Sequence, residues 1–174
     1  GTHNIGFVTP RISSKAEFSA LMVNVTPDQH LLDTGQYVPR WRYEQIAAES
    51  YLDLGGEGEV VNGYRRIDNI TDEALKRFSA AYGVSTGSTT WTKDDIFFYV
   101  YGLLHSSEYR ETYAADLKKM LPRIPLVEDP WPFVQAGRDL SELHLGYESV
   151  TPYPLSGLDT QPPSRTDPYD FYRV

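Results

Sequence analysis

The chain has 174 residues, of which 40% are hydrophobic and 13% aromatic, and its formal net charge is −8. This length and hydrophobic content suit one domain, or one domain plus a tail, and exclude an intrinsically disordered chain. Cysteine is missing from the sequence, which excludes a disulfide scaffold, a thiolate zinc site and a cysteine nucleophile. Apolar runs such as residues 96–101 are far shorter than the roughly 20 residues of a membrane span, so we expect a cytoplasmic protein.

The negative charge is unevenly distributed along the chain. Residues 46–60 contain four acidic and no basic side chains, and residues 126–174 contain eight acidic and three basic ones. Acidic and basic side chains nearly balance in residues 1–45 and 61–125. If the protein binds nucleic acid, we therefore expect a local basic patch outside the acidic segments, since the protein as a whole is not basic.

The N-terminal part, residues 1–45, is rich in strand signals. Short β-prone runs occur at residues 5–9 and 18–25, and prolines follow both. Residues 31–32 and 36–43, on either side of a turn, predict a hairpin in which Arg40 and Arg42 share one face. The acidic, Gly-rich stretch at residues 46–63 predicts a flexible loop that ends this part.

Residues 64–150 carry the helix signals. Thr71 is the expected N-cap of a first helix that stops at Gly83. Thr92 and Asp95 predict a capping box at the start of a second helix, and Ser107 is the expected cap of a third. A fourth helix is expected to begin near residues 129–131, after an extended connection that contains two prolines.

These elements predict a mixed α/β fold of the α+β kind. A small N-terminal β-sheet packs with a helical subdomain of about four helices, and an extended Pro-rich C-terminal tail follows at residues 151–174. The chain begins at Gly1 and ends on an aromatic, strand-like run, so we expect that both ends have been cut from a longer polypeptide.

Patterns typical of catalysis are weak throughout the sequence. The glycine stretch at residues 55–58 lacks the Lys-Ser/Thr of a phosphate loop, and no Gly-x-Ser-x-Gly motif occurs. The acidic pairs at 72–73 and 94–95 fall in first helical turns, where they complement the helix dipole. We therefore predict no catalytic residue, no metal site and no cofactor in this chain. The four histidines have no metal-ligand spacing: His3, His30, His105 and His144.

Arginines and hydroxyl side chains are the candidates for binding. Arg40 and Arg42 can direct two parallel donors at guanine edges in a DNA major groove or at phosphates. The alternatives remain a solvated strand face for the arginines and a plain connector for the hydroxyl-rich loop. The remaining DNA-binding candidates are basic residues near the ends of elements and the hydroxyls of that loop: Arg11, Lys15, Arg65, Arg66, Ser85, Thr86, Ser88 and Thr89.

One long stretch of sequence resembles a known family. Residues 94–106 (DDIFFYVYGLLHS) and 109–126, together with residues 70–75 and 133–148, are similar to the C-terminal specificity region of type ISP restriction-modification enzymes. The resemblance extends over roughly residues 6–154. It implies a large parent polypeptide with a nuclease, a helicase or translocase motor, an adenine-N6 methyltransferase and a terminal recognition domain.

The resemblance also implies a function for this chain. We expect a recognition module for double-stranded DNA that directs methylation and cleavage by other domains and has no enzymatic activity itself. The expected partners are double-stranded DNA and the methyltransferase and motor domains, with no membrane, and the parent is expected to use S-adenosylmethionine, ATP and Mg2+. The alternatives are a protein–protein interaction or coupling module without DNA contact and a small hydrolase, for which no nucleophile–base pair can be named.

Overall fold

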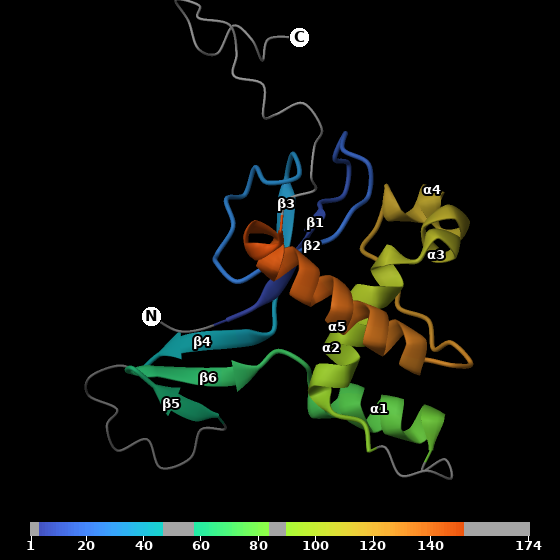
Figure 1. Cartoon of the computed structure of the whole chain (residues 1–174). Coiled ribbons are helices and arrows are strands. Elements are labelled where there is room, and N and C mark those ends of the chain that lie inside the picture. Colours follow the sequence, from blue (N-terminus) through green and yellow to red (C-terminus); the bar gives the residue numbers. More distant parts are fainter. Residues whose placement is uncertain (1–3, 47–57, 84–89, 152–174) are drawn as a thin grey trace, which may run out of the picture.

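The computed structural model describes residues 4–46, 58–83 and 90–151 (Figure 1). These described residues form two three-stranded antiparallel sheets, five α-helices and a short 3-10 helix. The mixed α+β fold predicted from the sequence is thereby confirmed. The expected Pro-rich tail lies outside the described residues, apart from Thr151.

The first sheet, sheet A, has the strand order β2-β1-β3. Its central strand β1 (Gly6–Pro10) pairs with β2 (Leu21–Val23) and with β3 (Gly35–Pro39). The central position explains why Phe7 and Val8 are buried. The predicted hairpin between residues 31–32 and 36–43 is wrong, because β3 pairs with β1 and residues 31–32 lie in a turn.

The second sheet, sheet B, has the order β4-β6-β5 and consists of β4 (Trp41–Gln45), β5 (Glu59–Val61) and β6 (Tyr64–Asp68). It begins one residue after sheet A ends, because only Arg40 separates β3 from β4. Both Asn62 and Gly63 have positive φ angles, of 52° and 81°, as a two-residue type I′ hairpin turn requires.

Sheet B corrects the predicted division of the chain. The loop predicted at 46–63 contains β5, and the helical part predicted at 64–150 begins with β6. The Asn-Gly dipeptide between Val61 and Tyr64 is a strong hairpin signal. The many glycine and acidic residues before this dipeptide led instead to the prediction of a loop.

The helices begin and end largely where the sequence predicts. Thr71 caps α1 (Asp72–Tyr82), which stops at Gly83, and the capping box of Thr92 and Asp95 opens α2 (Lys93–His105). These predictions are confirmed, as is the start of α5 (Trp131–Gly146) near residue 130. A 3-10 helix, η2 (Tyr147–Ser149), follows α5.

The third predicted helix differs from the structure in two respects. Its N-cap is Ser106, whose hydroxyl accepts from the Tyr109 N–H, and not Ser107. The helix is also interrupted at Tyr113, where φ is −106° and ψ is 16°, and so divides into α3 (Ser107–Thr112) and α4 (Ala114–Leu117).

The core lies around α2, which is apolar on most of its circumference. Helix α5 crosses α2 at very short range, because Gly102 and Gly137 leave room for the backbones to touch. Sheet A lies behind α5 and contacts it through β2 (Figure 1). In the described part of the chain, no helix is long and apolar enough to cross a membrane.

Buried tyrosines fix the extended segment between α4 and α5. The hydroxyl of Tyr99 donates to the Pro125 carbonyl at 2.7 Å, and that of Tyr109 donates to the Arg123 carbonyl at 2.8 Å. Backbone polar groups of an irregular segment need such partners when they leave water. Tyr99 and Tyr109 are therefore part of the scaffold.

Candidate nucleic-acid interface

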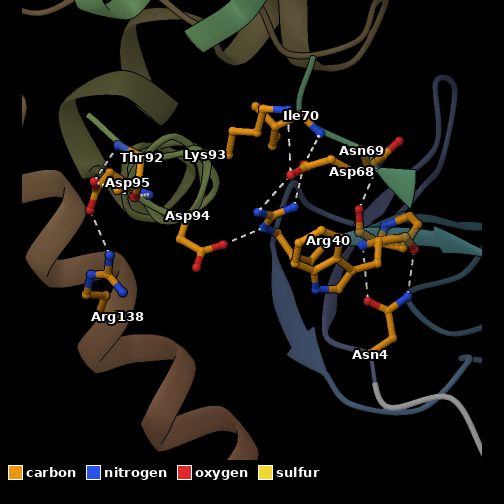
Figure 2. A network of polar contacts seen from close by, with 12 residues as sticks. Asn4, Arg40, Asp68, Asn69, Ile70, Thr92, Lys93, Asp94, Asp95 and Arg138 are labelled. Atoms are coloured by element: carbon orange, nitrogen blue, oxygen red, sulfur yellow. Dashed lines mark hydrogen bonds and ion pairs between the residues drawn. The ribbon is translucent and has the colours of Figure 1, made fainter. Parts of the chain in front are cut away.

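Arg40 lies in the interior at the junction of the two sheets, with only 4% of its surface exposed. Its Nε donates to Asp94 at 2.6 Å and its Nη1 donates to Asp68 at 2.6 Å (Figure 2). Its backbone N–H donates to the Ile5 carbonyl at 2.8 Å. The guanidinium donors that were expected to meet DNA are thus directed at two carboxylates of the same chain.

The bend at Arg40 explains why the prediction that Arg40 and Arg42 share one strand face is wrong. A single strand over residues 36–43 would put Arg40 and Arg42 on one face. The structure instead contains two strands in different sheets, and Arg40 is the bend between them. Arg40 therefore points into the molecule while Arg42 is exposed on β4.

Sheet B differs from the rest of the molecule in its exposure. None of the residues in its three strands is buried, and within the described chain no strand of sheet B packs extensively on a helix. In Figure 1 the sheet extends away from α2 and α5. A sheet of this kind, held at one end and accessible elsewhere, is suited to contact another molecule.

One face of sheet B, the tryptophan face, carries Trp41, Tyr43, Tyr64, Arg66 and Glu59, as the strand register shows. The Arg66 guanidinium lies 4.5 Å from the centre of the Trp41 ring and forms an ion pair with Glu59. These contacts hold Arg66 against its own sheet. Its charge is partly neutralised there, which reduces its attraction for a phosphate.

The opposite face, the Arg42 face, carries Arg42, Glu44, Val60, Arg65 and Ile67. Arg42 is exposed and has no ion pair with another described residue. Arg65 lies on the neighbouring strand at the diagonal position, at a Cα separation of about 7–8 Å. This face therefore carries two arginines on adjacent strands, the exposed Arg42 and the partly exposed Arg65, with Glu44 directly opposite Arg65.

A groove of about 460 Å3 lies between sheet B and the first residues of α1 and α2. Its lining contains three cations, Arg42, Arg66 and Lys93, and three carboxylates. Lys93 donates to Asp72 at 2.6 Å, and this bond raises the pKa of Lys93 and lowers that of Asp72. The balanced charge is unlike that of a phosphate site, where cations predominate.

Two further predicted site residues, Arg11 and Lys15, lie away from sheet B. Arg11 and Lys15 are exposed in the loop that follows β1, at the end of sheet A opposite to the Arg40 junction. A strand of five residues places them about 16 Å from that junction. The four hydroxyl candidates lie outside the described residues: Ser85, Thr86, Ser88 and Thr89.

Three residues that the sequence analysis passed over complete this region. Asn4 pairs with the backbone of Trp41, accepting from its N–H at 3.2 Å and donating to its carbonyl at 2.8 Å. Asn69 donates to the Pro39 carbonyl at 2.7 Å. Glu59 orients Arg66. The Asn-Gly hairpin turn was the signal that would have brought Glu59 and Arg66 into one sheet.

Comparisons with known proteins point to one family. The family model described as the Type ISP C-terminal specificity domain matches residues 1–174. A search of curated proteins gave no match.

Solved structures of much longer chains contain a similar region. A chain of the DrdV–DNA complex, determined by cryo-EM, has a TM-score of 0.75 and 34% identity over 98% of this chain and 15% of that chain. LlaBIII, an ATP-dependent Type ISP restriction-modification enzyme bound to DNA, has a TM-score of 0.67 and 26% identity, covering 89% of this chain and 9% of that one. A nuclease-deletion mutant of the Type ISP enzyme LlaGI, in complex with a DNA substrate mimic, gives 0.61 and 32%, with 88% and 11% covered.

Proposed function

Because the chain belongs to the family of Type ISP C-terminal specificity domains, we propose that it recognises a base sequence in double-stranded DNA through sheet B. The three similar chains were all solved with DNA or a DNA mimic. The observation that carries the assignment to sheet B is its exposure on both faces, with arginines on adjacent strands.

The dimensions of sheet B fit a major groove. Strands lie about 4.8 Å apart, and a major groove about 12 Å wide admits a two-stranded ribbon. Strands β4 and β6 would enter with the Arg42 face towards the bases. Arg42 then reads a base edge, since a guanidinium forms two parallel hydrogen bonds to guanine, and Arg65 contacts a base or the neighbouring phosphate.

The remaining activities belong to the proposal for the parent polypeptide. This chain spans 15% or less of the solved chains that it matches. We propose that other domains of the parent bind S-adenosylmethionine, ATP and Mg2+ and perform adenine methylation and cleavage in the cytoplasm. The specificity domain would dock against the methyltransferase and motor domains and determine where they act.

The test is a selection from short duplexes with a randomised centre, followed by affinity measurements. We expect the folded chain to enrich a motif, and Arg42→Ala to weaken binding about tenfold and to relax one base position. Arg77→Ala, on the exposed side of α1, is the matched control and should behave as the unmodified chain. The proposal is wrong if the folded chain enriches no motif, or if Arg42→Ala and Arg77→Ala bind alike.

A second candidate function is a coupling module that contacts protein and not DNA. Large apolar side chains are exposed in the last turn of α5 and in the residues that follow it, where Leu143, Tyr147 and Val150 are each more than half exposed. Failure to enrich any motif, with the chain folded, would favour this function.

A further inference from the structure

We propose that Arg40 is a positioning residue, which sets the angle between sheet B and the helical core and thereby the selectivity of DNA recognition. This inference rests on the proposed function of sheet B. It assigns a purpose to the most buried charged side chain of the region, whose donors are unavailable to DNA.

The need for such a residue follows from the chain path. Sheet B is joined to sheet A through the single residue Arg40 and to α1 through residues 69–71. Rotation about a few backbone bonds at these two links would swing the whole sheet, because within the described chain no helix packs extensively on its strands. Contacts at the junction must therefore hold the angle between sheet B and the helical core.

Arg40 contacts both sheets and α2, and Figure 2 shows its contacts to Asp68 and Asp94. Its guanidinium binds Asp68 at the end of β6, in sheet B, and Asp94 in the first turn of α2. Its backbone N–H donates to the carbonyl of Ile5, the residue before β1 of sheet A. Its own carbonyl accepts from the Asn69 N–H at 3.3 Å. One residue thus connects both sheets and the central helix.

The planar guanidinium is necessary for this geometry. Nε and Nη1 point in different directions within one plane, and each meets a separate carboxylate. The guanidinium carbon also lies 3.9 Å from the centre of the Trp41 ring, which fixes its plane at the first residue of β4. A lysine ammonium would supply the charge as a compact group with rotatable donors, without the fixed plane that stacks on the Trp41 ring.

Asp68 and Lys93 reinforce the same orientation. Asp68 accepts from the Ile70 N–H at 3.0 Å, so the end of β6 and the approach to α1 share one carboxylate. Lys93, the first residue of α2, places its Nζ 3.7 Å from the Asp68 carboxylate. The junction is therefore a network of charged hydrogen bonds with defined directions, unlike an apolar contact that can slide.

The preference for one base sequence depends on this angle more strongly than the overall affinity for DNA does. Contacts to phosphates tolerate small movements, whereas a bidentate contact to a base edge requires side chains placed within about 0.5 Å. A sheet that is free to tilt would keep its arginines and its general attraction for DNA. It would lose part of its preference for one sequence.

The decisive variant is Asp94→Asn, which weakens the link between Arg40 and α2 and leaves the link to Asp68. The Asp94 side chain is 56% exposed, so its neutralisation costs little stability. Arg138→Gln is the matched control, because it removes a similar ion pair of 2.7 Å, to Asp95, on the side of α2 that faces α5.

The measurement is the ratio of affinities for the selected duplex and for a random duplex, together with the melting temperature and the salt dependence of binding. We expect Asp94→Asn to lower the ratio about tenfold, the size of one lost base contact, at an unchanged salt slope. Arg138→Gln should keep the ratio even if its melting temperature falls as much or more.

Two outcomes would overturn the inference: equal ratios for Asp94→Asn and Arg138→Gln, or a loss in Asp94→Asn that only parallels its melting temperature. Failure of the proposed function would be recognised separately. In that case the unmodified chain selects no motif, or Arg42→Ala binds as Arg77→Ala does.

Discussion

At the scale of single residues, Arg40 and Arg42 show how differently the same residue type can act two positions apart. Arg40 is surrounded by Asp68, Asp94 and the Trp41 ring, whereas Arg42 is exposed on an accessible strand. A buried guanidinium contributes to stability only while its carboxylates remain in place. An exposed one contributes little to stability and is available for binding.

We predict a large loss of stability for one alanine variant and almost no change for the other. Arg40→Ala leaves Asp68 without its main partner in a partly buried site and should lower the free energy of unfolding by about 3 kcal/mol. Arg42→Ala should change it by less than about 0.5 kcal/mol. Urea denaturation followed by far-UV circular dichroism measures both. Equal losses in the two variants would contradict the burial of Arg40.

At the scale of elements, the helices follow from local sequence and the sheets do not. Thr71, Thr92 and Gly83 act on backbone groups within a few residues of themselves, so their roles can be read from the sequence. The pairing of β1 with β3 depends on residues that are far apart in the chain. The contact between α2 and α5 is similarly non-local, because the sequence around Gly102 or Gly137 does not indicate which helix packs against it.

The helix contact gives a steric prediction. A Cβ on Gly102 would lie 2.0 Å from the Phe133 carbonyl oxygen, which is backbone and cannot move aside without separating α5 from α2. Gly102→Ala should therefore destabilise the fold by about 3 kcal/mol or more. Thermal or urea denaturation provides the measurement.

Gly146, at the end of α5, is the control for that experiment. A Cβ there would meet only Ser149 Oγ at 3.6 Å, an ordinary contact. Gly146→Ala should be neutral or stabilising by up to about 1 kcal/mol. If both alanine variants retained full stability, the close crossing of the helices would be wrong.

At the scale of the whole molecule, a polar cluster connects sheet A with the two long helices. The Tyr101 hydroxyl on α2 accepts from the Met22 N–H of β2 at 2.8 Å and pairs with His144 of α5. His105 lies beside them, and its Nε2 is buried without a hydrogen-bond partner among the described residues. Protonation of these histidines therefore affects the interface that sheet A forms with α2 and α5.

The cluster predicts a loss of stability at mildly acidic pH. Burial, the nearby His144 and Arg110 lower the pKa of His105 from 6.5, and burial lowers that of His144. The unfolded chain, with ordinary histidine pKa values, then binds more protons than the folded one. The free energy of unfolding should be highest above about pH 6.5 and should fall as the pH decreases towards the lowered pKa values.

Urea denaturation across this pH range, with matched variants, checks the assignment. His144→Gln or His105→Gln should flatten the pH dependence, while His30→Gln, an exposed residue between β2 and β3, should leave it unchanged. A pH dependence that is the same in all three variants would place its origin elsewhere, for instance in the carboxylates.

The sequence by itself determined the family resemblance, the mixed fold class and most helix ends, because these depend on residue identity and on contacts within one helical turn. It also supplied the arginines of the candidate interface, but it did not separate their roles. The bend after Pro39 decided that Arg40 faces the core and Arg42 faces outward. Only the tertiary structure could decide this, because the carboxylates that bind Arg40 come from positions 28 and 54 residues further along the chain.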